Sequence, residues 1–267
     1  MGGIPRLLIV AGSDSGGGAG IQADLKSASA RGVYATTALT AITAQNTVGV
    51  QAVQVLPPDL VAAQIASVLD DIGADAVKIG MLGSAGVTMA VARALAKATA
   101  PIVLDPVMVA KSGDALLAPE AEQALCTHLL PRAALLTPNL PEAARLLGTA
   151  PARSLPEAEA QGHALLALGA AAVLMKGGHA SGTTCTDLLV TPQRTHSFSA
   201  PRQTTRNTHG TGCSYASAIA AELAKGVVLP EAVARAHGWL QGAIRAADRL
   251  EIGAGHGPVH HFHEVWP

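Results

Sequence analysis

Short apolar runs alternate with longer Ala- and Leu-rich stretches along most of this chain, and this alternation limits the possible folds more than any other feature. The short runs resemble buried strands and lie at residues 7–11, 76–79, 101–104, 134–136 and 171–175. The longer stretches have helical patterns and lie at residues 21–31, 87–98, 119–130, 140–147, 211–225 and 230–250. Strands that alternate with helices favour a mostly parallel sheet covered by helices on both faces. We therefore predict an α/β fold with a doubly wound sheet.

Two further strand-like segments, at residues 187–190 and 195–198, are separated by a short turn that contains Pro192. They predict a small antiparallel hairpin at an edge of the sheet. The 267 residues contain no internal repeat and no low-complexity linker. Since α/β domains can reach about 250 residues, we expect residues 1–267 to form one domain.

Composition excludes several functional classes. The formal charge is -1 and aromatic residues make up 2% of the chain, so we expect no nucleic-acid partner. The longest apolar stretch, residues 164–175, is shorter than the roughly 20 residues that span a bilayer. The first residues lack a secretory apolar region, which favours a cytoplasmic protein without a membrane partner. The cysteines, Cys126, Cys185 and Cys213, form no C-x-x-C pair and are expected to be reduced thiols.

Ligands of doubly wound sheets bind beyond the carboxyl ends of the strands, and the first predicted strand is followed by a glycine-rich segment, GSDSGGGAG at residues 12–20. Residues 18–23 match the G-x-G-x-x-A pattern of dinucleotide-binding proteins, so an NAD-dependent oxidoreductase is one alternative. That pattern requires an acidic residue about 20 positions later, and none occurs between Asp24 and Asp59. A P-loop is excluded because the chain contains no Gly-Lys pair.

A second glycine-rich segment, HGTGC at residues 209–213, immediately precedes a helical pattern. Backbone N–H groups at a helix start bind anions, aided by the helix dipole, so a phosphate group is the expected ligand. The same dipole is expected to lower the pKa of the Cys213 thiol. The alternative is that Cys213 is a small residue that only packs at the start of the helix.

Three charged residues follow other predicted strands. Asp105 and Glu142 could hold Mg²⁺ through their carboxylates, although each could instead cap a helix or lie on the surface. Lys176 could place its ammonium group against phosphate oxygens, or it could simply be solvated. The His-rich tail at residues 257–263 lacks Cys or acidic ligands at useful spacing, so we favour a packed or solvated tail over a metal site.

Taken together, these segments resemble one family, the hydroxymethylpyrimidine/phosphomethylpyrimidine kinases of thiamine biosynthesis, which belong to the ribokinase-like superfamily. The resemblance covers nearly the whole chain and rests on motifs in one order: residues 12–24, AQN at 44–46, KIGM at 78–81, DPVM at 105–108, KSGD at 111–114, TPNLPE at 137–142, KGGH at 176–179, NTHGTGC at 207–213 and GPVHHFH at 257–263.

The resemblance implies a ribokinase-like fold and two successive phosphorylations. ATP, with Mg²⁺, would phosphorylate 4-amino-5-hydroxymethyl-2-methylpyrimidine and then its monophosphate, and the enzyme would be a homodimer. The implied site residues fall into three groups. Gly12, Asp24, Gln45, Met81 and Val107 would surround the pyrimidine. Lys176, Gly210, Thr211, Gly212 and Asn139 would attend the phosphates, with Asp105 and Glu142 at the metal and Cys213 near the reacting oxygen.

One departure from the wider superfamily affects the expected chemistry. That superfamily has an aspartate as base where this chain has Cys213, a pattern that is typical of the pyrimidine kinases. Relatives that phosphorylate pyridoxal overlap with this group, so a pyridoxal kinase is the nearest alternative function.

Overall fold

In the computed structural model, which describes residues 3–108, 119–179 and 182–266, one mixed sheet of nine strands runs through the molecule. Its order is β3-β2-β1-β4-β5-β6-β7-β8-β9. The strands are β1 (Arg6–Asp14), β2 (Tyr34–Gln45), β3 (Val50–Val55), β4 (Ala76–Ile79), β5 (Ile102–Leu104), β6 (Leu135–Leu136), β7 (Val173–Met175), β8 (Thr184–Val190) and β9 (Thr195–Pro201). The predicted doubly wound α/β fold is confirmed.

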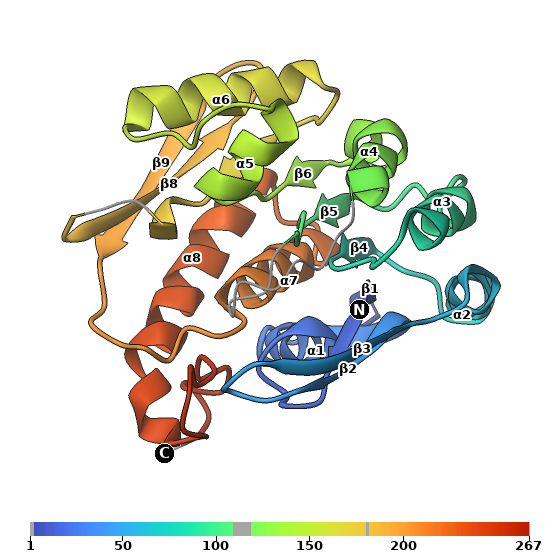
Figure 1. Cartoon of the computed structure of the whole chain (residues 1–267), viewed down its shortest axis with the longest axis horizontal. Coiled ribbons are helices and arrows are strands. Elements are labelled where there is room, and N and C mark those ends of the chain that lie inside the picture. Colours follow the sequence, from blue (N-terminus) through green and yellow to red (C-terminus); the bar gives the residue numbers. More distant parts are fainter. Residues whose placement is uncertain (1–2, 109–118, 180–181, 267) are drawn as a thin grey trace.

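Helices cover both faces of this sheet (Figure 1). One face carries α2 (Pro58–Asp71), α3 (Ala85–Ala94), α4 (Pro119–His128), α5 (Leu140–Leu147) and α6 (Leu155–Ala167). The other carries α1 (Gly20–Ala30), α7 (Thr211–Ala224) and α8 (Leu229–Arg245). Short 3₁₀ turns lie at η1 (Leu130–Arg132), η2 (Gly177–His179) and η3 (Ala247–Leu250).

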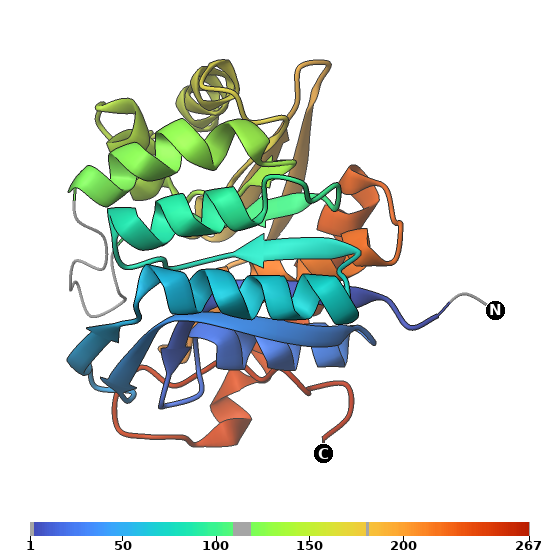
Figure 2. The ribbon, with the colours of Figure 1, turned by 90° about the vertical axis from the view of Figure 1, so that its right-hand side faces the viewer.

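The two faces have separate apolar cores because side chains alternate along each strand. In β1, Leu8 and Val10 pack toward α2–α6, whereas Leu7 and Ile9 pack toward α1, α7 and α8. Strands that are buried on both faces are continuous apolar runs, which is the pattern that the sequence shows. Figure 2 looks onto the face of the sheet that α2, α3 and α4 cover.

Antiparallel strands end the sheet at both edges. β8 and β9 form the predicted hairpin, which extends beyond the expected residues at both outer ends. At the other edge β3 pairs antiparallel with β2, and neither strand was predicted. Helix α2 was not predicted, and α6 was only partly anticipated. The predicted helical stretch at 230–250 divides into α8 and η3.

A fully buried ion pair joins β4 to the layer that contains α1 and α7. Lys78 Nζ lies 2.9 Å from both carboxylate oxygens of Asp24 in α1, and the Ser217 hydroxyl in α7 donates to the same carboxylate at 2.7 Å. Lys78 and Asp24 are both 0% exposed. Burial alone would lower the pKa of Lys78, but the negative charges of Asp24 and its neighbours raise it above its usual value, so the ammonium group is charged.

We predict that Asp24→Asn lowers the free energy of unfolding by about 3–5 kcal/mol, because Lys78 then remains buried without its counter-charge. Adding Lys78→Met to that variant removes the orphaned charge and should restore part of the loss. Urea unfolding of the wild type, the single variant and the double variant measures both effects. A double variant less stable than Asp24→Asn would contradict this account.

Candidate active site

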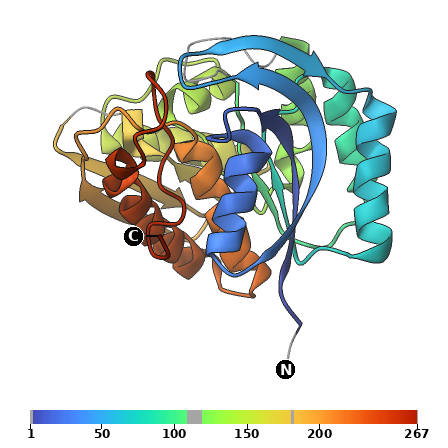
Figure 3. The same ribbon diagram turned by 90° about the horizontal axis from the view of Figure 1, so that it is seen from below.

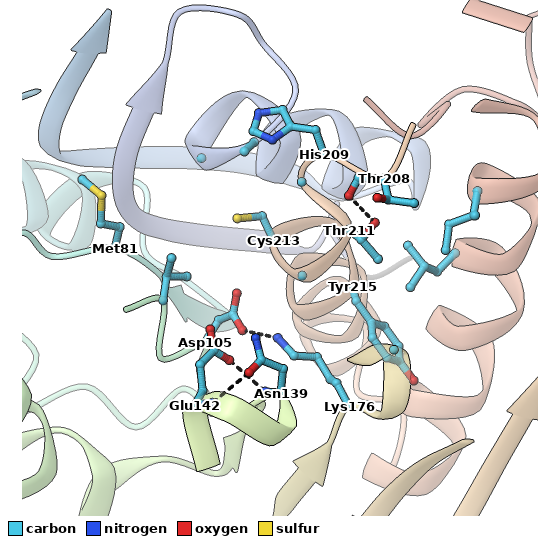
Figure 4. Close-up of a pocket in the computed structure, with 18 of the residues that line it drawn as sticks. Met81, Asp105, Asn139, Glu142, Lys176, Thr208, His209, Thr211, Cys213 and Tyr215 are labelled. Carbon is cyan, nitrogen blue, oxygen red and sulfur yellow. Dashed lines mark hydrogen bonds and ion pairs between the residues drawn. The ribbon is translucent and has the colours of Figure 1, made fainter. Parts of the chain in front are cut away.

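A cavity of about 1000 Å³ lies beyond the carboxyl ends of the parallel strands, where doubly wound sheets bind their ligands. Its wall is built from segments that follow β1, β4, β5 and β7, together with the start of α5 and the first turn of α7. Figure 4 shows side chains from these segments converging on it. Most of the residues proposed from sequence therefore meet in one place.

Asp105, which follows β5, is the centre of the polar side of the cavity and is 1% exposed. Its Oδ1 accepts hydrogen bonds from Lys176 Nζ and from the Thr137 hydroxyl, each at 2.8 Å. Thr137 follows β6 and Lys176 follows β7, so three neighbouring strand ends supply the cluster. Burial raises the pKa of Asp105, but the charges of Lys176 and Lys78 outweigh it and hold that pKa below its usual value.

Asn139 and Glu142 form a capping box at the start of α5. The Asn139 side chain accepts from the Glu142 backbone N–H, and the Glu142 carboxylate accepts from the Asn139 N–H, each at 2.8 Å. The motif fixes both side chains on the cavity wall. The pKa of Glu142 is raised to about 7, mainly by burial. The negative charge of Asp105 adds to this rise, and the positive charge of Lys176 opposes it. A buried and a half-buried carboxyl group in one cavity are a suitable setting for a hard divalent cation.

The first turn of α7 faces Asp105 across the cavity (Figure 4). The helix follows Gly210, which has φ +75°, and no side chain caps it. A side chain at Gly210 would collide with the backbone of Gly18 in the loop after β1, and one at Gly18 would meet the His209 ring. The two glycine-rich segments found in the sequence are therefore in contact. The start of α7 lines the cavity, where its free backbone N–H groups can bind an anion.

Cys213 lies in that first turn, and its sulfur points into the cavity (Figure 4). Burial raises the pKa of this thiol to about 11; Lys78 and a backbone hydrogen bond from Gly20 lower it, whereas Asp24 and Asp105 raise it. The expectation of a lowered pKa is therefore wrong. The helix dipole is equivalent to only about half a charge, which does not offset desolvation beside two carboxylates.

Gly12, Gln45, Met81 and Val107 line the less polar side of the cavity. A Cβ at Gly12 would lie 2.7 Å from the Met81 methyl group, so glycine is needed for Met81 to reach the wall. The Ser15 hydroxyl donates to the Gln45 carbonyl at 2.7 Å and accepts from its N–H at 2.8 Å. These bonds fix the backbone from which the Gln45 amide projects.

Asp24 is the one proposed pyrimidine contact that the structure does not bring to the cavity wall. It lies on the inward face of α1, one turn after Gly20, and its carboxylate is occupied by Lys78 and Ser217. Lys78, its partner, does line the cavity. Asp24 therefore lies behind the wall, paired with a residue that lines it.

Sequence reasoning gave no role to Lys78, Asp14 or His209, which also line the cavity. The Asp14 carboxylate accepts from the N–H groups of Gly16, Gly18 and Ala19 and lies 2.8 Å from His209 Nε2. A charged residue inside an apolar strand was the signal available for Lys78. No comparable signal links Asp14 to His209, because they are far apart in the chain.

The His-rich tail is packed, as favoured from sequence. His260 and His261 are 3% and 4% exposed, and within the described residues no group of three or more His, Cys, Asp or Glu side chains could hold a metal ion. The KSGD motif at 111–114 lies outside the described residues. Among the helices that the structure describes, none is both long enough and apolar enough to cross a membrane.

A doubly wound sheet in which a glycine-rich helix start faces a buried Lys–Asp pair is typical of ribokinase-like kinases, and comparison with known proteins identifies the family. The sequence model of phosphomethylpyrimidine kinase matches residues 14–260. Hydroxymethylpyrimidine/phosphomethylpyrimidine kinases from Rhizobium meliloti and Salmonella typhimurium are 54% and 52% identical to this chain. These matches cover 97% of this chain and 97% and 98% of the relatives. The chain belongs to the phosphomethylpyrimidine kinase family.

Solved structures give the same fold. Pyridoxal kinase from Bacillus subtilis in an ADP complex superimposes with a TM-score of 0.91 at 35% identity, covering 99% of this chain and 100% of that one. Phosphomethylpyrimidine kinase from Clostridium difficile gives a TM-score of 0.80 at 42% identity, covering 91% and 100%. The predicted ribokinase-like fold and kinase activity are confirmed, and the oxidoreductase alternative is wrong.

We predict that iodoacetamide alkylates Cys213 at pH 7.5 at least about tenfold more slowly than it alkylates a free cysteine, because only the thiolate reacts. The rate should keep rising above pH 9, as expected for a pKa of about 11. Peptide mass spectrometry separates Cys213 from Cys126 and Cys185. Rapid labelling of Cys213 that levels off below pH 8 would contradict the raised pKa.

Proposed function

We propose that this chain uses ATP to phosphorylate 4-amino-5-hydroxymethyl-2-methylpyrimidine and then its monophosphate, giving the diphosphate used in thiamine diphosphate biosynthesis. The observation that carries the proposal is one cavity in which the α7 start faces the Asp105–Lys176 pair while Gln45 and Met81 line the other side. The described residues contain one such arrangement. Both phosphorylations would therefore use the same site.

Phosphoryl transfer depends mainly on positioning and charge neutralisation. In this proposal Lys176 places its ammonium group against the transferred phosphoryl group and remains oriented by Asp105. The N–H groups at Gly210, Gly212 and Cys213 would bind phosphate oxygens. The Thr211 hydroxyl donates to the Thr208 carbonyl at 2.7 Å and would have to exchange that bond to join them. The Asn139 amide, fixed by the capping box, would contact the nucleotide phosphates.

Asp105 and Glu142 would hold Mg²⁺, which neutralises charge on the ATP phosphates when bound. The donor set fits, because Mg²⁺ commonly binds one or two carboxylates together with substrate phosphates and retains several waters. Asp105 Oδ1 is occupied by Lys176 and Thr137, so its second oxygen is the one available. The raised pKa of Glu142 also fits, since a nearby cation would stabilise its ionised form.

The neutral Cys213 thiol would orient the acceptor hydroxyl rather than remove its proton in advance. In a loose transition state the bond to the acceptor oxygen is only slightly formed, so the acceptor hydroxyl need not be ionised before the phosphoryl group is transferred. In the second reaction the acceptor is a phosphate oxygen that is already ionised. A thiol with a pKa of about 11 is compatible with both acceptors.

The aminopyrimidine would lie against the wall that Gly12, Met81 and Val107 form together. The Gln45 amide can donate and accept, which suits the edge of an aminopyrimidine. Met81 would contribute a polarizable apolar contact to the ring. Lys78, held by Asp24, would supply a fixed positive charge in the wall.

A pyridoxal kinase is the second candidate, favoured by the TM-score of 0.91 with the B. subtilis enzyme. The relatives at 54% and 52% identity support the pyrimidine instead.

We further propose that the protein is a cytoplasmic homodimer built from a single domain. Exposed apolar side chains on β2 and β3, Ile42 and Val53, support an interface there.

Mass spectrometry of products from ATP, Mg²⁺ and the hydroxymethylpyrimidine tests the function, and we predict the monophosphate followed by the diphosphate. Lys176→Ala should lower both turnover rates by about 10²-fold or more, because it removes charge stabilisation at the transferred group. Lys97→Ala, at an exposed lysine, is the control and should behave as the wild type. Loss of one step alone would contradict a shared site, and absence of phosphorylated pyrimidine would contradict the function.

A second prediction distinguishes the two substrates. Gln45→Leu leaves polar atoms of a buried aminopyrimidine unpaired, which costs about 1–3 kcal/mol for each group. The variant should therefore lose more kcat/KM with the hydroxymethylpyrimidine than with pyridoxal. Equal losses for both substrates would show that Gln45 does not recognise the pyrimidine edge.

A further inference from the structure

The C-terminal segment at residues 257–261 lies against the loop that precedes α7. The His209 backbone N–H donates to the Gly257 carbonyl at 3.0 Å, and His209 forms a parallel bridge with Pro258. A Cβ at Gly18 would lie 3.2 Å from Pro258 Cβ. The tail therefore contacts both glycine-rich segments without lining the cavity.

His261 extends this contact to the first turn of α7. Its Nε2 lies 2.9 Å from the hydroxyl oxygen of Ser214, the residue after Cys213. The Ser214 hydroxyl also donates to the Gly210 carbonyl at 2.8 Å. Because the hydroxyl proton is used there, Nε2–H of the ring is the donor to Ser214. Burial, followed by the charges of Lys26, His260 and His263, lowers the pKa of His261 to about 3, so the ring is neutral at physiological pH.

The tail is anchored independently of α7. The His260 N–H donates to the Ala243 carbonyl in α8 at 3.0 Å, and the His256 N–H donates to Thr47 in the turn after β2 at 2.8 Å. The Asn207 side chain accepts from the Gly257 N–H at 3.0 Å. Figure 3 shows the C-terminal segment, in red, reaching the turn between β2 and β3. His261 is thus presented to α7 from a fixed support.

We propose that His261 is a positioning residue for phosphate binding: through Ser214 it fixes the Gly210 carbonyl and the first turn of α7. The inference rests on the proposed phosphate role of residues 210–213. That turn begins after a glycine with φ +75° and has no side-chain cap, so its placement depends on the bonds that Thr211 and Ser214 make and on the segments packed against it. Phosphoryl transfer depends on accurate placement of its donors, and small displacements are costly.

His261→Leu tests the proposal against a matched control, His260→Leu, which removes a neighbouring buried imidazole of the same tail. The first variant should bind Mg²⁺–AMP-PNP about tenfold more weakly by calorimetry, because the buried Ser214 hydroxyl loses its donor. The kcat of both phosphorylations should fall, whereas KM for the pyrimidine should change less than twofold. The control should lower Tm by a similar amount but leave nucleotide affinity and kcat within about twofold of the wild type.

His261→Gln provides the rescue, since a glutamine amide can also donate to Ser214. It should recover nucleotide affinity to within about threefold of the wild type. If His261→Leu does not fold, Ser214→Ala tests the same contact from its other side and should weaken nucleotide binding about as much. Ser214→Ala removes the other partner, so combining it with His261→Leu should add little further loss. Additive losses, an unchanged affinity in His261→Leu, or an equal loss in His260→Leu would overturn the proposal. Because nucleotide affinity is measured without pyrimidine, this test does not depend on whether the hydroxymethylpyrimidine is phosphorylated.

Discussion

The close approach of two glycine-rich loops determines where the site can form. The loop after β1 and the loop before α7 meet at Gly18 and Gly210, where a side chain at Gly210 would collide with the backbone of Gly18. Asp14 consolidates the contact by accepting three backbone N–H groups of its own loop and by lying 2.8 Å from His209. With the loops joined in this way, the start of α7 faces the carboxyl ends of the parallel strands. The cavity is a consequence of that contact.

Charge inside the cavity is arranged around Asp105. Lys176 approaches it from β7, while Lys78, held by Asp24, adds a second buried ammonium group in the wall. Two cations keep Asp105 ionised despite its burial, yet Cys213 remains a neutral thiol because desolvation and two carboxylates oppose its ionisation. Burial raises the pKa of both groups, and the nearby charges decide the net shift: two lysines outweigh burial at Asp105, whereas two carboxylates add to it at Cys213.

Much of the fold was accessible from sequence because its central strands are buried on both faces. β5 and residues 7–11 of β1 are continuous apolar runs and were predicted, whereas β2 and β3 were not. β2 mixes alanine with threonine and has partly exposed positions, and β3, with the sequence VQAVQV, is exposed along most of its length at the sheet edge. Edge strands acquire their conformation by pairing with a neighbour, which local composition records only weakly. The capping box of α5 is a local motif, and that helix was predicted at its observed bounds.

Strand periodicity, glycine-rich helix starts and ordered motifs are properties of neighbouring residues, so the class of fold, the family and the segments that form the site could all be predicted from the amino-acid sequence. Tertiary structure alone decided which side chains face the cavity and which charges they meet. It moved Asp24 behind the wall, brought Lys78 into it, raised the pKa of Cys213 and placed His261 beside Ser214. Each of these outcomes depends on contacts between residues distant in the chain, and on burial, which exists only once the chain has folded.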